Sequence, residues 1–307
     1  FLENAGVGHS GAGEGDTKHM IDSHHHLWDL SAVHYPWLEA SGVNRFFGDP
    51  TPIQRNYLID EFRCHASAEG FKGSVHIQVG ATDGFAEANW VQQIADQTPD
   101  WQIAQVVFCD LTSPDLPAQL DAFEELTTVR GVRQIIGRAP GEDAATGTND
   151  LLRSPAFLAG LIEVGRRGLS FDLQLIPELM ATTADILESA PDTRVALCHA
   201  GSPHDRSSHG LDSWARSLRR LSTLPQIVCK LSGLGMFDHG WTPQSFTPII
   251  DTCLDQFGLE RCMFGSNFPV DSLYSDYATL VAAHRQIVPE TCHAAVFGET
   301  AKTFYSL

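Results

Sequence analysis

The sequence of 307 residues contains no run of 18 apolar residues, so it predicts no membrane-spanning helix. Basic side chains are scarce, because 20 Lys and Arg stand against 38 Asp and Glu, and the formal net charge is −18. So acidic a chain repels phosphate backbones, and nucleic-acid binding is not expected. Hydrophobic residues make up 43% and charged residues 19%, which is typical of a globular protein and not of a disordered one.

Cysteine pairs of the CxxC type are also absent. The seven cysteines are spread along the chain, and four of them lie in apolar, strand-like runs: Cys109, Cys198, Cys229 and Cys262. This usage indicates reduced, buried thiols and predicts an intracellular, cytoplasmic protein. The sequence has no GxSxG elbow, no HExxH, no P-loop and no dinucleotide-binding glycine motif after a strand, which excludes the enzyme classes that depend on them.

Residues 1–19 differ from the rest of the chain. They are rich in Gly and polar residues, have no apolar period and lack the pattern of a signal peptide. The GAGEG stretch has no strand before it and no helical pattern after it, so it does not predict a nucleotide site. We therefore expect a flexible leader or cloning tail, with Met20 as the candidate natural start, and a single domain over 20–307.

From Met20 onward, short strand-like runs alternate with helical patterns. Eight runs rich in β-branched, aromatic and other apolar residues predict strands at 20–25, 73–79, 102–108, 131–136, 169–175, 194–199, 226–232 and 261–266. Helical period or helix-start signals mark 83–97, 154–168, 177–190, 211–222 and 242–258. Eight such repeats favour an α/β fold of the (β/α)8 barrel type over an open sheet. The long gap at 27–72 predicts a loop over the barrel mouth before its helix.

Polar side chains recur on one face of several predicted strands. Gln78, Gln174 and Lys230 each alternate with apolar neighbours, and successive side chains on a strand point to opposite faces. Unpaired polar groups inside a barrel would cost several kcal/mol each, on the order of 2–7. The pattern therefore favours a solvated pocket at the carboxyl ends of the strands, although a paired polar network that only fixes packing stays open.

Histidines stand at the ends of two predicted strands. His24 and His26 are two residues apart in DSHHHLW, so they share one side of the first strand while His25 faces away. His199 ends the sixth strand, in the segment Cys198-His199-Ala200-Gly201. Converging imidazoles can bind a divalent metal or polarise a carbonyl oxygen. A surface cluster for the pair and a structural role for His199 are the alternatives.

Two further signals concern charge. Arg133 lies on an inner strand and needs an anion, either a substrate oxygen or an internal partner such as Asp172 or Asp110; Lys230 could take either role. The eighth strand ends in MFGSNFPVD, where a base that deprotonates water would stand. Asn267 cannot be that base, because an amide takes up no proton near neutral pH. Two alternatives stay open for Asp271: it reaches back to act as the base, or it caps the next helix.

Taken in order, DSHHHLWD, the GVR strand, GLSFDLQL, LCHAGSP, VCKLSGL and RCMFGSNFPVD resemble the amidohydrolase superfamily. Within it they resemble the sugar-lactonase branch, which includes L-fuconolactonase, L-rhamnonolactonase and pyrone-dicarboxylate lactonase. The resemblance runs from about Met20 to Leu307. It implies a distorted TIM barrel that hydrolyses a lactone or related cyclic ester.

By position, the resemblance assigns the HxH motif to His24 and His26, the histidine of strand six to His199 and the substrate-clamping arginine to Arg133. Gln174 and Lys230 also match members of the branch. The departure is Asn267, because many members carry GSDWPV, whose Asp activates water and, in metal enzymes, binds the metal. The resemblance thus implies either no required cofactor or one divalent metal such as zinc, held by His24, His26 and His199.

The hypothesis at this point is a hydrolase whose small-molecule substrate is a lactone of a sugar acid or of a carboxylated ring. His24, His26 and His199 polarise the carbonyl, Arg133 with Gln78, Gln174 and Lys230 holds substrate oxygens, and Asp271 or a histidine is the general base. The alternatives are a metal-dependent amide hydrolase or decarboxylase of the same superfamily, a lactone isomerase, and a binding protein that has lost catalysis. No membrane or nucleic-acid partner is expected, and a homo-oligomer stays open.

Overall fold

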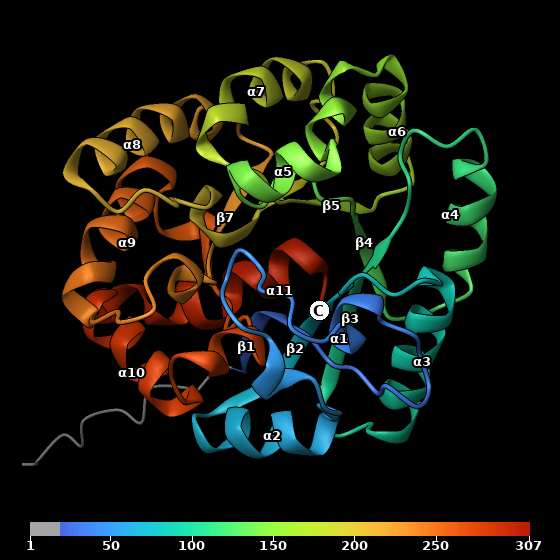
Figure 1. The fold of residues 1–307 in the computed structure, drawn as a ribbon, viewed down its shortest axis with the longest axis horizontal. Helices are drawn as coiled ribbons and strands as arrows, with labels where there is room; N and C mark the ends of the chain where they lie inside the picture. Colours follow the sequence, from blue (N-terminus) through green and yellow to red (C-terminus); the bar gives the residue numbers. More distant parts are fainter. Residues whose placement is uncertain (1–18) are drawn as a thin grey trace, which may run out of the picture.

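Eight parallel strands lie in sequence order in one sheet that curls into a barrel (Figure 1). The structure is a computed structural model that describes residues 19–307, so the predicted leader lies outside the described residues except for His19. The strands are β1 Met20–His25, β2 Phe71–Ile77, β3 Gln102–Phe108, β4 Val129–Arg133, β5 Ser170–Leu173, β6 Val195–Leu197, β7 Ile227–Leu231 and β8 Cys262–Phe264. The predicted (β/α)8 barrel is confirmed.

The strand bounds explain how the pocket forms. β1 and β3 match their predicted ranges, whereas β5, β6 and β8 have only 4, 3 and 3 residues. Three polar residues predicted at the ends of these strands therefore lie just beyond them: Gln174, His199 and Ser266. Because the chain leaves the sheet early, these side chains lie at the carboxyl end of the barrel, where TIM barrels build their sites.

The barrel is closed between β8 and β1 by side chains and loop backbone. The Ser23 hydroxyl donates to the carbonyl of Phe264 at 2.6 Å, and the Asn267 amide N–H donates to the carbonyl of His24 at 2.7 Å. A Cβ at Gly265 would lie 2.6 Å from the Cβ of His24, so only glycine permits this approach. The closure brings the residues after β8 beside the histidines of β1.

Helices surround the strands in Figure 1. They are α2 Ile59–Ala68, α3 Gly84–Gln97, α4 Leu116–Glu124, α6 Pro155–Arg166, α7 Met180–Glu188, α8 Ser208–Ser222, α9 Pro243–Phe257 and α10 Tyr277–Ile287. Asp83 caps α3, and Thr242 with Ser245 forms a capping box on α9. The five predicted helices are confirmed, and α4 and α10 were not predicted. Within residues 19–307, no helix is both long and apolar enough to cross a membrane.

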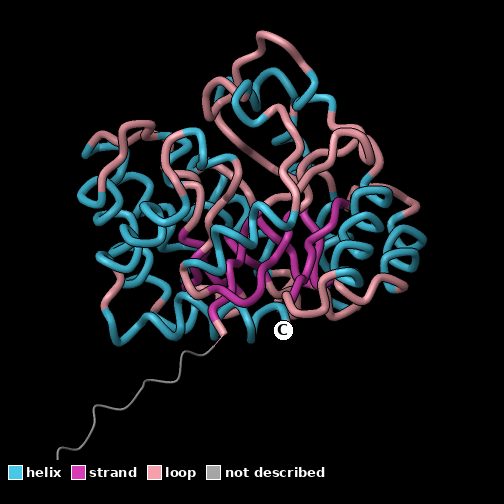
Figure 2. The backbone as a smooth tube through the Cα atoms, turned by 90° about the horizontal axis from the view of Figure 1, so that it is seen from below, coloured by secondary structure: helices cyan, strands magenta, loops and turns pink. Residues whose placement is uncertain are grey.

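The two ends of the barrel differ. Inside it, apolar side chains such as Val75, Val106 and Met263 pack against Phe304 and Tyr305 of the last helix, α11 Thr300–Tyr305. Figure 2 shows the C-terminus beneath the strands and long loops beyond their other end. One end is thus closed by α11. The other carries α1 Pro36–Glu39 and α5 Pro140–Thr146 and contains the cavity described next.

Candidate active site

A cavity of about 300 Å³ lies at the carboxyl ends of the strands. Its lining includes side chains from the loop over 27–72, namely Trp37, Arg45, Phe46 and Phe47, so the predicted loop over the mouth is confirmed. Among the predicted site residues, the cavity is lined by His26, Gln78, Arg133, Gln174, His199 and Asn267. His24, Lys230 and Asp271 lie behind this surface. The cavity is of the size that encloses a small molecule.

The three predicted histidines meet although 173 to 175 residues separate His199 from the pair in the chain. The ring centroid of His24 lies 5.1 Å from that of His26 and 4.6 Å from that of His199. His25 faces the other way and stacks on Phe62 at 3.9 Å. The alternation expected for an extended strand is therefore confirmed, and one small molecule can touch both His26 and His199.

Unusual backbone aims His199 at the cavity. His199, Ala200 and Ser202 have φ of 56°, 52° and 53°, a left-handed conformation that is rare outside glycine and common at functional sites. The His199 Nδ1 lies 3.0 Å from the Ser232 hydroxyl, which fixes the ring. A Cβ at Gly233 would collide with this ring, so the sequence Ser-Gly after β7 leaves room for the imidazole.

Burial keeps these imidazoles neutral. It lowers the pKa of His24 and His199 well below the ordinary value and that of His26 to about 3. The next contribution is repulsion from a cation, Lys230 for His24 and Arg133 for the other two. Both ring nitrogens of His24 lack a hydrogen-bond partner among the described residues. The site therefore offers lone pairs and N–H donors rather than positive charge at the histidines.

Arg133 is a buried cation without a carboxylate partner in the described part of the chain. It is 4% exposed, and its Nη1 donates to Gln174 Oε1 at 2.9 Å and its Nη2 to the carbonyl of Gln78 at 2.5 Å. Its Nε has no partner. The alternative of an internal ion pair does not apply, because Asp172 pairs with Lys230 and Asp110 bonds Thr112 and Gln134. A buried charge of this kind needs an anion from outside.

Lys230 lies beneath the cavity and not at its surface. Its Nζ donates to Asp172 Oδ2 at 2.6 Å and to the carbonyl of Ser23 at 2.7 Å, and both side chains of the ion pair are fully buried. The Tyr305 hydroxyl donates to Asp172 from below, at 2.9 Å. The structure thus does not bring Lys230 to the substrate side. Instead, the ion pair of Lys230 and Asp172 links β1, β5 and α11 beneath the histidines.

Asn267 and Asp271 form a short chain from the cavity inward. Asn267 has φ of 56° and lines the cavity, with its Oδ1 3.3 Å from His26 Nε2. Its Nδ2 donates to Asp271 Oδ1 at 3.2 Å. Burial raises the pKa of Asp271 to about 7, and its Oδ2 has no partner. Asp271 therefore bonds to Asn267 and is not among the described residues that line the cavity.

Asp22 also supports the site and was not predicted. Its Oδ1 accepts the backbone N–H groups of His24 at 3.1 Å and Ser266 at 2.9 Å, and the Tyr277 hydroxyl donates to its Oδ2. It thereby holds the end of β1 against the loop after β8. Its place beside the HxH motif was the only signal in the sequence. Arg45, Arg138 and Gln134 also line the cavity, and no sequence pattern singled out Arg138 or Gln134.

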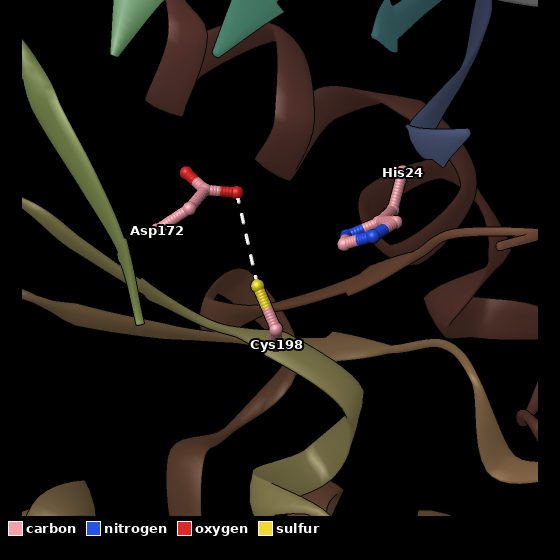
Figure 3. A group of neighbouring side chains, drawn as sticks. All are labelled: His24, Asp172 and Cys198. Carbon is pink, nitrogen blue, oxygen red and sulfur yellow. Dashed lines mark hydrogen bonds between the residues drawn. The ribbon is translucent and has the colours of Figure 1, made fainter. Parts of the chain in front are cut away.

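One group of side chains has the donor types that zinc takes. The ligand atoms of His24, Asp172 and Cys198 lie within 4.8 Å of one another. Figure 3 shows the three side chains pointing toward one another. His24 has two free nitrogens, which fits a metal ligand. However, burial raises the pKa of Cys198 to about 12, and the Lys230 ammonium already neutralises Asp172. A metal at this group would compete with that ammonium, whereas the imidazoles of His26 and His199 line the cavity itself.

Comparison with known proteins places the chain in a family. Residues 21–307 match the family described as amidohydrolase, so the chain belongs to it, as the resemblance of its motifs implies. It is 35% identical to the uncharacterized protein y4mH of Sinorhizobium fredii, over 93% of this chain and 98% of that one. It is 32% identical to an L-fucono-1,5-lactonase of Burkholderia multivorans, over 94% and 96% of the two chains.

Solved structures agree in fold. An amidohydrolase from Burkholderia multivorans, solved with bound zinc, superposes with a TM-score of 0.79 at 25% identity and covers 94% of this chain and 99% of its own. A probable 2-pyrone-4,6-dicarboxylic acid hydrolase from Acinetobacter baumannii, with citric acid bound, has a TM-score of 0.70 at 16% identity, over 94% and 99% of the two chains. The second likeness shows the barrel alone.

Proposed function

We propose that the protein is a lactonase that opens a small cyclic ester by attack of water on its carbonyl carbon. The relative that is 32% identical over nearly the whole chain is an L-fucono-1,5-lactonase, which supports ester-ring hydrolysis as the activity. The observation that carries the proposal is Arg133, a buried guanidinium that lines the cavity beside two neutral imidazoles and has no carboxylate partner in residues 19–307. Such a cation stabilises the oxyanion that forms during acyl transfer.

The carbonyl oxygen is held by Arg133 and His199 in this mechanism. Ser232 Oγ accepts the backbone N–H of His199 at 3.3 Å, and in this mechanism its hydroxyl donates to Nδ1, which lies 3.0 Å away. The neutral ring then carries its proton on Nε2 and presents an N–H donor. Two donors of this kind, one of them charged, favour the transition state over the ground state because negative charge develops on the carbonyl oxygen as water adds.

His26 accepts the proton of the attacking water. Its Nδ1–H donates to the carbonyl of Ile77 at 2.8 Å, so the lone pair of the neutral ring is on Nε2, on the side of Asn267. The facing Oδ1 of Asn267 is a second acceptor, and one water can donate to both. As the oxyanion forms at Arg133, the repulsion that lowers the pKa of His26 is offset, and the imidazole becomes a better base.

Asp271 positions Asn267 in this scheme. When ionised, its carboxylate accepts the Nδ2–H of Asn267, which keeps Oδ1 turned toward His26 and the water. Collapse of the tetrahedral intermediate breaks the bond between the carbonyl carbon and the ring oxygen. The proton on His26 passes to that leaving oxygen, which becomes a hydroxyl, and the product is the open-chain hydroxy acid. Lys230 supports the floor through Asp172 and Ser23 without touching substrate.

Both ring nitrogens of His24 are without a partner among the described residues, which fits a ligand of a divalent metal such as zinc, and in this proposal His26 and His199 would be the other donors that hold it. When bound, it would supply Lewis-acid polarisation of the carbonyl. The buried group of His24, Asp172 and Cys198 favours a second candidate function, a metal-dependent amide hydrolase or decarboxylase of the same family.

The two functions are separated by a screen of lactones with a pH indicator, because ring opening releases acid. We expect acid release by the wild type, at least about 100-fold reduced in His199→Ala, with or without chelator. Stoichiometric metal together with activity on an amide or carboxylate substrate that chelation abolishes would favour the second function. No turnover of any lactone would refute the first.

A further inference from the structure

The charged side chains that line the cavity are all cationic. They are Arg45, Arg133 and Arg138, and no Asp or Glu of residues 19–307 lines it. This is opposite to the net charge of −18 of the whole chain. A concave site of one sign concentrates ligands of the other sign, because low-dielectric walls focus its field. Arg133 is assigned above to the carbonyl oxygen, which leaves two guanidiniums that the mechanism does not use.

Arg45 and Arg138 share one carboxylate. Arg45 lies on the mouth loop and its Nη2 is 2.8 Å from Glu142 Oε1, while Arg138 follows β4 and its Nε is 3.6 Å from the same oxygen. The buried Asp143 is a second carboxylate beside Arg138, whose backbone N–H it accepts. With Arg133, three positive charges stand against these two carboxylates, which leaves an excess of one. The side chains of Arg45, Arg138 and Glu142 are only 19%, 24% and 20% exposed, so water screens this excess incompletely.

The two guanidiniums are also held in place. Arg45 lies over the rings of Trp37 and Phe47, at 5.4 and 5.9 Å from their centroids, which orients its donors before a ligand arrives. Burial lowers the pKa of Arg138; Glu142 opposes this, and the cations Arg45 and Arg133 add to it. Their mutual repulsion is the interaction that a bound anion would relieve.

We propose that Arg45 and Arg138 form an anion-binding subsite that selects lactones carrying a carboxylate over neutral sugar lactones. The inference rests on the proposed lactonase function and adds the substrate class to it. The carbonyl of the ring lies at Arg133 and His199, and the carboxylate of the same molecule lies at Arg45 and Arg138, under the mouth loop. Planar guanidinium forks match carboxylates, and charge-assisted bonds of this kind are about twice as strong as neutral ones.

The test compares an aldonolactone with the matching aldarolactone, which differ in CH₂OH against COO⁻ at one carbon. We expect kcat/KM of the wild type to be at least about 10-fold higher for the aldarolactone, and Arg138→Gln to lower this preference about 10- to 100-fold, mainly through KM. Glu142→Gln removes the competing carboxylate and is expected to raise the preference above that of the wild type. A misfolded variant cannot produce that gain.

Arg153→Gln is the matched control, because the side chain of Arg153 is 85% exposed and pairs with Asp150 at the surface. It removes one positive charge from a neighbouring segment, and the preference is expected to stay at the wild-type value. Equal or better turnover of the aldonolactone by the wild type, or an unchanged preference in Arg138→Gln, would overturn the subsite and leave the lactonase function standing.

If the wild type hydrolyses neither of these lactones nor any other lactone of the screen, the proposed function fails, and the subsite is tested by binding. Calorimetric titration with the open-chain aldarate is then expected to give a Kd at least about 10-fold lower for the wild type than for Arg138→Gln. Equal affinities would overturn the subsite as well.

Discussion

Replacement of Arg133 by Met tests separately how this residue contributes to catalysis and to the stability of the fold. Arg133 donates to Gln174 Oε1 and to the carbonyl of Gln78 and is 4% exposed, without a carboxylate partner among the described residues. Loss of one oxyanion donor in a buried site removes about 3–4 kcal/mol of transition-state stabilisation. We therefore expect kcat/KM for the lactone to fall about 100- to 1000-fold.

The free energy of unfolding, in contrast to kcat/KM, is expected to stay unchanged or to rise in Arg133→Met. Burying one charge costs several kcal/mol, roughly 3–5, and hydrogen bonds to a charged group return about 1.5–3 kcal/mol each. These terms nearly cancel, and Met fills most of the volume while water in the cavity satisfies Gln174 and the Gln78 carbonyl. The free energy of unfolding should thus stay within about 1 kcal/mol of the wild type, or rise.

Two assays measure these quantities: acid release from the lactone under kcat/KM conditions, and urea unfolding followed by far-ultraviolet circular dichroism. Arg130→Met is the control, because Arg130 lies on the same strand, donates to the carbonyls of Thr127 and Val129 and does not line the cavity. The reasoning is refuted if Arg133→Met keeps kcat/KM within about threefold of the wild type, or if it loses more than about 2 kcal/mol of stability.

Three further outcomes are expected. Burial raises the pKa of Asp271 from 3.8 to about 7, so its contribution to stability is full below pH 3.8 and is lost as pH rises through 7. From pH 5 to pH 8 the free energy of unfolding of Asp271→Asn should therefore rise relative to that of the wild type by about 3 kcal/mol, measured by urea unfolding. Because the ionised carboxylate positions Asn267, wild-type kcat/KM should rise as pH increases through 7, and this rise should disappear in Asp271→Asn. An unchanged pH profile in the variant would contradict the positioning role. The ring of His24 packs against those of His26 and His199, so His24→Ala should misplace both and lower kcat/KM about 100-fold, whereas His25→Phe, which keeps the stack on Phe62, should stay within about threefold; the reverse order would refute the assignment of faces. Dialysis against chelator should change lactone turnover less than about threefold, since Arg133 supplies the charge at the carbonyl, and a loss above 100-fold that zinc restores would transfer that role to the metal.

Much of the fold followed from local pattern. Eight apolar runs separated by helical segments predict parallel strands with crossover helices, and the order in the sheet is the order in the chain. Strand alternation placed His24 and His26 on one side and His25 on the other, because the backbone of an extended strand leaves no other choice. The predicted strand ranges were too long at β5, β6 and β8, where tertiary contacts end the sheet early.

The roles of single polar residues could be predicted less well from the sequence. Lys230 alternates with apolar residues in the same way as Gln174, yet Lys230 lies in an ion pair under the cavity and Gln174 lines it. The difference depends on how deep each residue lies in the barrel, and on Tyr305, which reaches Asp172 from the last helix, 133 residues away. Sequence pattern gives the face of a strand and not the partner opposite it.

The sequence alone determined the alternation of strands and helices, the shared face of the HxH pair and the amide of Asn267 just after the eighth strand, since each depends only on neighbouring residues. Tertiary structure decided which cation is neutralised: it pairs Asp172 with Lys230 and leaves Arg133 without a carboxylate partner among residues 19–307. It also placed Arg45 of the mouth loop and Arg138 of the β4 loop on one carboxylate. These pairings depend on distances between segments far apart in the chain, and electrostatic energy depends on those distances and on burial, which local sequence does not encode.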